Sequence, residues 1–352
     1  MVRALVRPGK LKGKPNDAES TGTEVGVYSD YGTLHEVVVG HFNDFIYAEL
    51  SPSVRYVHPE LRALLEAQEG KPLNVKEALP ERYEQTVQQL EALAATYEKF
   101  GVKVHRARRF TEDEKRYLDD LQGGHALIYP ADPVFVLGKH FIELCIRRPY
   151  RRKEVFPLRD LICPMIADDS EAHHVAMPQA APRREFGEGP GPFLEGGDII
   201  VEGKNVIVGQ GEVCSNQAGS DWLASYLEPF GYRIHPMIIN GLWLHALGVM
   251  CLLRDGLLMA YLPALSEGLP APLKDWEVIE ITEKECMTLA TVGVSLDPQR
   301  YMINYKHNRI MEELDKRGIE PIPLETDHIS FWGGDIRCST LPIVRDPVGS
   351  GS

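Results

Sequence analysis

The sequence predicts an α/β protein in which similar units of hairpin, helix and strand close into a ring, with the strands inside and the helices outside. Two observations lead to this prediction. A strand-turn-strand pattern recurs along the chain, and amphipathic helices that run directly into a short strand accompany it. Because one such unit cannot bury its apolar face alone, neighbouring units must pack on one another. We therefore expect one domain, with the residues that open onto the axis of the ring sharing a cavity.

The first unit begins with the apolar strand 37–40 and later contains a helix over 80–100. Five residues fall on one face of this helix at spacings of three and four, namely Tyr83, Val87, Leu90, Ala94 and Tyr97. The helix stops at Gly101, and residues 102–105 alternate as a strand does. Two later helices run into strands in the same way, 217–229 into 230–236 and 307–317 into 318–323.

Four hairpins complete the repeating pattern, and their turns contain the Gly-Lys and Asp-Gly pairs typical of hairpin chemistry. They cover 132–144, 198–209, 249–261 and 292–304, the last turning at an Asp-Pro pair. The longest irregular stretch, 168–192, is interpreted as a functional or mobile loop that includes Glu185 and Glu188. Its His173-His174 pair is interpreted as solvated rather than metal-binding, because adjacent side chains on an extended chain point apart.

The composition is that of an ordinary globular protein and restricts the partners. Of 352 residues, 43% are hydrophobic and 25% charged. A net charge of −13 disfavours nucleic acid and anionic membranes as partners. No apolar run has the roughly 18 to 20 residues of a membrane helix, and no signal-peptide pattern is present. We expect a cytoplasmic protein with a flexible tail over 1–24, a catalytic domain over 25–347, and a disordered tail or linker remnant over 348–352.

The cysteines are expected to be reduced, since no secretion signal is present. No two form a CxxC pair, which excludes zinc-ribbon and thioredoxin-like sites. Cys338 differs from the others because it follows Gly333-Gly334 at the entrance of an apolar, β-branched strand, although a core position is the alternative. The other five are interpreted as apolar filler: Cys145, Cys163, Cys214, Cys251 and Cys286.

Three more polar residues, Asp132, Glu195 and His245, lie at or near the entrance of predicted apolar strands. Separately, they could be a turn cap, a surface ion-pair partner and a satisfied core histidine. Together with Cys338 they form a cysteine-nucleophile constellation, since buried carboxylates and imidazoles are costly unless they pair or perform a task. In this hypothesis Cys338 attacks and His245 moves protons. Glu195 orients the imidazole and stabilises its cation, and Asp132 binds a positive group.

The motifs that contain these residues resemble those of the guanidino-group-modifying (pentein) superfamily over about residues 25–347. They are, in order, Pro-x-Asp-x-Val-Phe-Val at 130–136, Leu-Glu-Gly-Gly-Asp-Ile at 194–199, Leu-His at 244–245 and Gly-Gly-x-x-x-Cys at 333–338. The resemblance implies a five-bladed α/β propeller with pseudo-fivefold symmetry. Segments 31–40, 314–319 and 338–341 resemble the amidinotransferases that act on glycine or inosamine phosphate.

By the family's pattern, Cys338 is the nucleophile, His245 the acid and base, and Glu195 its carboxylate partner. Asp132 becomes the guanidinium ligand, Asp198 joins the substrate-binding residues, and no metal or organic cofactor is implied. Two positions depart from the pattern. Leu247 stands where members that act on free arginine usually have an acidic guanidinium ligand. In this respect the sequence resembles the dimethylarginine hydrolases, which lack that ligand. Arg337 replaces a histidine common in amidinotransferases, and a fixed cation there would suit a carboxylate or phosphate of the substrate. We therefore expect a substituted guanidine, or a smaller amidino compound, to be preferred over arginine.

The sequence is interpreted as that of a cysteine-dependent amidinotransferase that moves an amidino group from arginine or a modified guanidine to an amine through an amidino-cysteine intermediate. One alternative on the same fold is a guanidino-compound hydrolase of the deiminase or dimethylarginine-hydrolase type. An alternative of another class is a catalytically inactive propeller that acts as a binding protein, although Cys338, His245 and Glu195 together argue against it. The expected partners are a small-molecule guanidino donor and an amine acceptor, with self-association left open.

Overall fold

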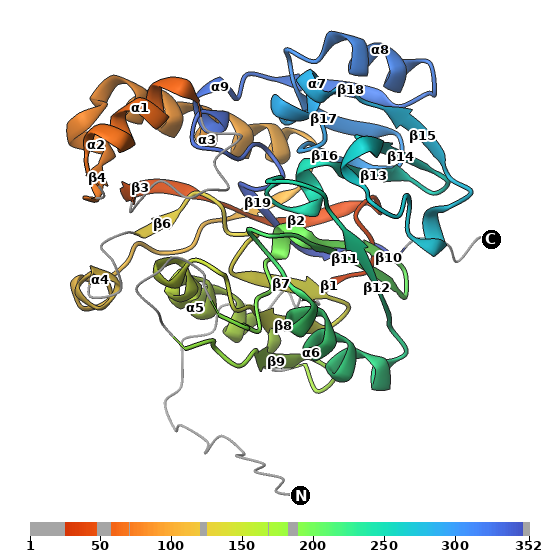
Figure 1. Ribbon diagram of the computed structural model, residues 1–352, viewed down its shortest axis with the longest axis horizontal. Helices are drawn as coiled ribbons and strands as arrows, with labels where there is room; N and C mark the ends of the chain where they lie inside the picture. Colours follow the sequence, from red (N-terminus) through yellow and green to blue (C-terminus); the bar gives the residue numbers. More distant parts are fainter. Residues whose placement is uncertain are drawn as a thin grey trace, which may run out of the picture.

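The computed structural model describes residues 25–47, 58–69, 71–119, 125–167, 169–181 and 189–347. The expected tails over 1–24 and 348–352 lie outside the described residues. The described chain forms six small sheets with helices around them, so the α/β class is confirmed. Figure 1 shows α6 (Gln217–Leu227) and α8 (Asn308–Asp315) at opposite margins of the molecule, with strands between them.

Five of the sheets share one three-stranded pattern within the described residues. The first strand is antiparallel to the second, and the second is parallel to the third. These units are β7 (Val134–Leu137), β8 (His140–Glu143) and β9 (His173–Ala176); β10 (Ile199–Glu202), β11 (Asn205–Gln210) and β12 (Arg233–Ile238); β13 (Met250–Arg254), β14 (Leu257–Ala260) and β15 (Glu277–Glu280); β16 (Val294–Asp297), β17 (Arg300–Asn304) and β18 (Glu320–Leu324); and β19 (Thr340–Arg345), β2 (Leu34–Val39) and β5 (Lys103–His105).

The last unit joins the two ends of the described chain, because β19 comes from its C-terminal part and β2 from its N-terminal part. The short strand β1 (Gly26–Val27) extends this sheet by pairing in parallel with β19. A helix precedes the third strand in four units: α3 (Pro80–Lys99), α5 (Val155–Ile166), α6 and α8. In the β13–β15 unit two 3-10 turns take its place, η6 (Leu262–Ala264) and η7 (Ala271–Leu273).

The remaining elements were not predicted from the sequence. In the sixth sheet, β3 (His41–Tyr47) pairs antiparallel with both β4 (Leu73–Asn74) and β6 (His125–Leu127). The other described helices are α1 (Pro59–Ala67), α2 (Val75–Ala78), α4 (Glu112–Asp119), α7 (Glu283–Met287) and α9 (Asp327–Ser330). Among the residues that the structure describes, no helix is long and apolar enough to cross a membrane.

The predicted hairpins and the predicted helix-strand units are all present. The apolar face of α3 is also as expected, since Tyr83, Leu90, Ala94 and Tyr97 are buried, with Val87 partly so. One continuous apolar cluster contains residues from several units, among them Ile200, Leu252 and Ile303. Neighbouring units therefore bury their faces against one another, and no described unit has a core of its own.

The interpretation of 168–192 as irregular was wrong in its first part, because this segment contains β9. His173 stacks on His140 with ring centroids 4.8 Å apart, and His174 Nε2 lies 2.6 Å from Oε1 of Glu143. These histidines are thus strand residues with protein partners rather than solvated loop residues. Glu185 and Glu188 lie outside the described residues.

Candidate active site

The residues predicted to carry the chemistry occupy equivalent places, each shortly before the first strand of a different unit. Asp132 precedes β7 and Glu195 precedes β10, while His245 precedes β13 and Cys338 precedes β19. The fold brings Asp132 and Glu195 within ion-pair distance of His245. Cys338 lies close enough for the charge of Asp132 to raise the pKa of its thiol. Residues far apart in the sequence therefore gather in one place.

Two glycines directly after Glu195 allow the backbone to pack closely against residues 131–132 and against His245. A Cβ on Gly196 would lie 1.9 Å from the carbonyl oxygen of Ala131, and one on Gly197 would lie 2.3 Å from Nδ1 of His245. Both distances are far inside van der Waals contact. The Gly196 N–H also donates to the Asp132 carbonyl at 3.0 Å. The Gly-Gly pair thus lets the backbone pack against Asp132 and under the imidazole ring.

His245 is buried, and its backbone has φ +67°, a region that non-glycine residues rarely adopt. Residues held in such conformations cost about 1–3 kcal/mol and persist where the surroundings enforce them. Nε2 of His245 lies 2.6 Å from Oε2 of Glu195, and Nδ1 lies 3.8 Å from Oδ1 of Asp132. Burial lowers the pKa of His245, but Asp132, Glu195 and Asp198 more than offset this and raise it to about 9. The imidazole is therefore a cation at neutral pH.

Glu195 is fully buried and is held as a carboxylate. Its Oε1 accepts the Arg147 backbone N–H at 2.9 Å, and Nη1 of Arg148 lies 3.7 Å from Oε2. Burial opposes ionisation, yet the bond to His245 and the Arg148 charge lower the pKa of Glu195 to about 2. Glu195 can therefore fix the ring orientation of His245 and stabilise its protonated form.

Asp132 has one oxygen in use and one free. Oδ2 is 2.7 Å from Nη1 of Arg151, whereas the buried Oδ1 has no hydrogen-bond partner among the described residues. A buried carboxylate oxygen without a donor is costly, so such an atom needs an explanation. Oδ1 is on the side of the carboxylate nearer to His245. A ligand that brings N–H donors and positive charge would satisfy it.

Arg151 and Glu154 complete this arrangement and were missed in the sequence. Arg151 Nε and Nη2 donate to the two carboxylate oxygens of Glu154, at 2.9 and 2.8 Å. Burial raises the pKa of Glu154 to about 7 despite this arginine. A signal existed, because 147–153 is a basic run within an acidic chain. Most of it forms a 3-10 turn, η2 (Pro149–Lys153), whose first four residues are buried.

This buried group is dense in charge. It contains four carboxylates, Asp132, Glu154, Glu195 and Asp198, beside the cations Arg148, Arg151, Arg152 and protonated His245. Uncompensated charge away from water is expensive, and burial raises the pKa of Glu154 and of Asp198. It is therefore the unpartnered Oδ1 of Asp132, rather than the charge balance, that favours a positively charged ligand.

Cys338 is half-buried in a turn that leads into β19. The Ser339 N–H donates to the Asp335 carbonyl at 3.0 Å, and a Cβ on Gly334 would lie 3.0 Å from Cβ of Cys338. Desolvation, followed by the charge of Asp132, raises the pKa of the Cys338 thiol to about 12, although Arg337 opposes the shift. Without a bound cation, Cys338 is therefore a thiol at neutral pH. The described residues hold no group of three or more His, Cys, Asp or Glu side chains suited to a metal ion.

Comparison with known proteins finds similar amidinotransferases, although no family model matches the chain. The chain is 25% identical to inosamine-phosphate amidinotransferase 1 of Streptomyces griseus over 91% of its length and 97% of the relative. Its fold is similar to that of SxtG, an amidinotransferase from Microseira wollei, with a TM-score of 0.76, 21% identity, and coverage of 94% of this chain and 98% of that one. The chain is thus similar to amidinotransferases of the guanidino-group-modifying (pentein) superfamily.

Hydrolases are also among the solved structures with a similar fold. Dimethylarginine dimethylaminohydrolase of Pseudomonas aeruginosa matches with a TM-score of 0.60 and 17% identity over 88% of this chain and 100% of that one. The same fold thus occurs in proteins named as transferases and in proteins named as hydrolases. The fold does not by itself decide between the two reactions.

Both carboxylate oxygens of Asp198 accept hydrogen bonds within the protein. Oδ1 accepts the Ala246 N–H at 2.9 Å, and Oδ2 accepts the Ser215 hydroxyl at 2.6 Å. Ala246 follows His245 and begins the 3-10 turn η5 (Ala246–Gly248), so this contact supports the unusual backbone of the histidine. Direct contact between Asp198 and a substrate stays a prediction.

Leu247 and Arg337 also have partners inside the protein. Leu247 is buried in the largest apolar cluster, and its carbonyl accepts the Thr291 hydroxyl at 2.8 Å. Nη2 of Arg337 lies 3.4 Å from Oδ1 of Asp30, and its Nη1 donates to the Thr340 carbonyl at 3.1 Å. The roles of both residues in substrate choice stay predictions.

Proposed function

We propose that this protein is a cysteine-dependent amidinotransferase, which moves an amidino group from a guanidino donor to an amine acceptor. The observation that carries the proposal is the unpartnered Oδ1 of Asp132, which lies beside the His245–Glu195 pair and within reach of Cys338. The named activities of the sequence relative and of SxtG support transfer as the reaction.

Substrate binding would begin at Asp132. A guanidinium offers planar N–H donors and one positive charge, which match the unpartnered carboxylate oxygen Oδ1 of Asp132. Its charge would also oppose the effect of Asp132 on Cys338, whose pKa is raised to about 12 in the free protein. Binding would thus favour the thiolate at the moment when its target carbon is held nearby.

In the first half-reaction, the Cys338 sulfur would attack the guanidinium carbon and form a C–S bond. The bond from that carbon to the donor's amine nitrogen would break, and its electron pair would leave with the nitrogen. Protonated His245 would supply the proton for this amine from Nδ1, because Nε2 is engaged with Glu195. The products are the free amine, neutral His245 and an amidino group on Cys338.

In the second half-reaction, the acceptor amine would attack the amidino carbon while His245 takes one of its protons. The C–S bond would break, and its electron pair would return to sulfur as the thiolate. Glu195 would stabilise the imidazolium that forms again. The sequence of bonds made and broken needs no oxidant, reductant or organic cofactor.

The site also fits the finer prediction for the fold, a closed five-bladed propeller. In support, successive units are joined by Gly196 to Asp132, Ala246 to Asp198, and Ser295 to Leu253. Arg345 of β19 reaches the Ser295 carbonyl of β16, and β19 in turn contacts β7. These contacts support the proposal that the five units close into a ring, in which each of the four candidate residues precedes the first strand of its unit.

A hydrolase is the second candidate, favoured by the likeness to dimethylarginine dimethylaminohydrolase. Water would then discharge the amidino-cysteine in place of an amine. Position 247 also resembles the dimethylarginine hydrolases, because it holds a leucine where an acidic residue is usual in members that act on free arginine. Both reactions share the first half and differ only in the acceptor.

Intact-mass spectrometry tests the proposal directly. Incubation with arginine, N-methylated arginine or guanidinoacetate should add the mass of one amidino group to the wild-type protein but not to Cys338→Ala. Discharge of this adduct by an added amine, with appearance of a new guanidine, indicates transfer, and discharge by water alone indicates hydrolysis. Failure of every guanidino compound to form an adduct would contradict both candidates and favour a binding protein.

Asp132→Asn is expected to weaken donor binding more than it slows the chemical step. The change removes the negative charge that the guanidinium would meet but keeps the shape and an amide oxygen. Hydrogen bonds to charged groups contribute about 1.5–3 kcal/mol, so we expect KM to rise about 10- to 100-fold. Single-turnover kinetics over a range of donor concentrations separates the two effects. Asp275→Asn, at an exposed position, is the control, and equal losses in binding and chemistry would contradict the role of Asp132.

The pH dependence of donor capture follows from two raised pKa values. The reaction needs a Cys338 thiolate and a protonated His245, and their pKa values are about 12 and about 9. Below pH 9 the thiolate fraction rises about tenfold per pH unit while His245 keeps its proton, so kcat/KM should rise with it. Above that pH each gain in thiolate is cancelled by loss of the imidazolium, and the profile should level off. A profile that is flat or falls between about pH 6 and 8 would contradict this scheme.

A further inference from the structure

The turn that carries Cys338 contains a buried acid, Asp335, which the proposed reaction does not use. Asp335 lies three residues before Cys338 and is almost completely buried. Burial raises the pKa of its carboxyl group to about 7, and among the described residues Asp335 has no ion-pair partner. Burial of a carboxyl group without a cation is costly, so this side chain needs compensating donors and a reason to be there.

Three hydrogen-bond donors converge on the Asp335 carboxylate. Oδ1 accepts the Ile336 N–H at 2.9 Å, and Oδ2 accepts Nδ2 of Asn304 at 3.3 Å. The third partner is the Thr326 hydroxyl, which itself accepts from Nδ2 of Asn304 at 2.9 Å. The Asn304 amide cannot turn round without loss, because its Oδ1 accepts the Lys306 N–H at 3.1 Å. These surroundings therefore suit a short side chain that only accepts hydrogen bonds, which is an aspartate.

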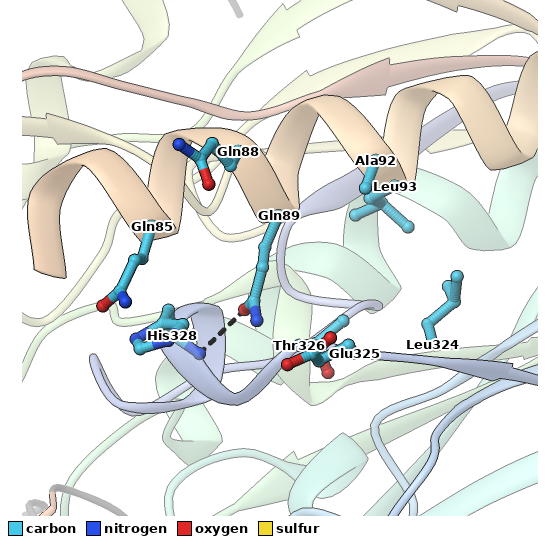
Figure 2. A pocket seen from close by; sticks show the side chains of 9 residues that line it. All are labelled: Gln85, Gln88, Gln89, Ala92, Leu93, Leu324, Glu325, Thr326 and His328. Carbon is cyan, nitrogen blue, oxygen red and sulfur yellow. Dashed lines mark hydrogen bonds between the residues drawn. The ribbon is translucent and has the colours of Figure 1, made fainter.

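The elements that hold Asp335 are themselves fixed. Asn304 is the last residue of β17, and Thr326 directly precedes α9. Thr326 also lines a pocket of about 340 Å³ between α3 and residues 324–328 (Figure 2). Figure 2 shows Gln89 directed from α3 to the backbone of His328, which donates to Oε1 of Gln89 at 2.8 Å. This bond holds the start of α9, and with it Thr326, against α3.

Asp335 passes this support on to the nucleophile through one peptide group. The peptide that joins Asp335 to Ile336 has its N–H bonded to Oδ1 of Asp335, and its carbonyl accepts the Ser339 N–H at 3.0 Å. The side chain thus fixes the plane of the peptide that closes the turn around Cys338. Burial and the Asp132 charge raise the pKa of the Cys338 thiol, and a backbone hydrogen bond from Asp335 is the largest effect that lowers it. The charge of the Asp335 carboxylate has a smaller, opposite effect.

We propose that Asp335 is a positioning residue, which holds the sulfur of Cys338 in the orientation needed for attack on the substrate. It acts through the turn of residues 335–339 and touches no reacting atom. The inference rests on the proposed function, because it takes Cys338 as the nucleophile. A misplacement of about 1 Å at a reacting group can cost about 10²-fold in rate. Loss of Asp335 should therefore slow the chemical step, whereas donor binding is assigned to Asp132.

Single-turnover formation of the amidino adduct, followed by intact mass over a range of donor concentrations, separates these two effects. Asp335→Ala should lower the maximal rate about 10- to 100-fold and change the half-saturating donor concentration by less than about threefold. Thr326→Val removes one donor to Asp335 at nearly constant shape, and it should lower the maximal rate about 3- to 10-fold. Thr326→Ser keeps the hydroxyl and should recover most of that loss.

Asp297→Ala is the matched control for Asp335→Ala. Asp297 is also buried, and its Oδ1 accepts a backbone N–H, that of Gln299, at 2.8 Å. It belongs to the hairpin turn between β16 and β17, so its loss should lower the thermal unfolding temperature and leave the maximal rate within about twofold of the wild type. Hydrogen-exchange mass spectrometry gives a readout that needs no substrate. Peptides that cover 335–340 should exchange faster in Asp335→Ala than in the wild type or in Asp297→Ala, because the Ser339 N–H loses its fixed acceptor.

The results separate a failure of this inference from a failure of the proposed function. If the wild-type protein forms no adduct with any donor, amidino transfer is wrong, and the exchange rates alone decide whether Asp335 holds the Cys338 turn. If the wild type forms the adduct and Asp335→Ala forms it equally fast, Asp335 is not a positioning residue and the function stands. An equal loss of rate in Asp297→Ala, or a Thr326→Ser variant no faster than Thr326→Val, would also overturn the inference. If Asp335→Ala does not fold, the two Thr326 variants decide the question.

Discussion

Replacing Cys338 by alanine is expected to lower the rate of amidino transfer by a factor of about 10⁴ or more, because no other atom can form the C–S bond. The fold should persist, since Cys338 is only half-buried and the backbone bond from Ser339 to Asp335 does not involve its side chain. The measurement is kcat/KM for the best guanidino donor, with thermal unfolding of both proteins recorded in parallel.

Cys163→Ala is the matched control for this variant. Cys163 is the other half-buried cysteine of the described chain, and its sulfur also lies near an imidazole, 3.6 Å from Nδ1 of His174. Losing that thiol should leave transfer unchanged. If Cys338→Ala kept more than about a hundredth of the wild-type rate, the nucleophile would have to be sought elsewhere.

The parts of the fold that could be predicted are those encoded within short segments. A hairpin is specified by its own turn, as at Gly203-Lys204 between β10 and β11. The helix α3 is specified by its own apolar spacing, and it ends where Gly101 takes φ +80°. The candidate site could be predicted for a related reason. A polar residue or cysteine at the entrance of an apolar strand is unusual in any one segment, and four segments of this chain have one.

The parts that could not be predicted depend on partners far away in the sequence. The strand β9 was missed because His173 and His174 look polar and solvated, and only pairing with β8 makes their segment a strand. Arg151 was missed for the same reason. A basic run is ordinarily a solvated surface, and nothing local indicates that this one is buried between Asp132 and Glu154. The bonds of Asp198 to Ser215 and Ala246 are likewise contacts with residues far away in the sequence, which no local pattern indicates.

Glu195→Gln is expected to slow the chemical step by a factor of about 10² to 10⁴ while changing donor binding little. The carboxylate is one of the groups that raise the pKa of His245 to about 9, and the neutral amide cannot stabilise the imidazolium in this way. The variant should therefore hold less His245 in the protonated form that is needed to release the donor's amine. The level region of the pH profile should begin at a lower pH than in the wild type. Single-turnover rates across pH measure both effects.

Glu143→Gln is the matched control, because Glu143 is also buried and its Oε1 lies 2.6 Å from Nε2 of His174. Its pKa is likewise lowered to about 2, through bonds to Arg159 and His174 that outweigh burial. Both variants therefore remove a buried carboxylate that pairs with an imidazole, and both are expected to lose a similar amount of stability, as measured by thermal unfolding. Only Glu195→Gln should slow transfer and move the pH profile. If the two variants reduced activity equally, or if Glu195→Gln left the profile in place, Glu195 would be a structural residue and His245 would not be the proton carrier.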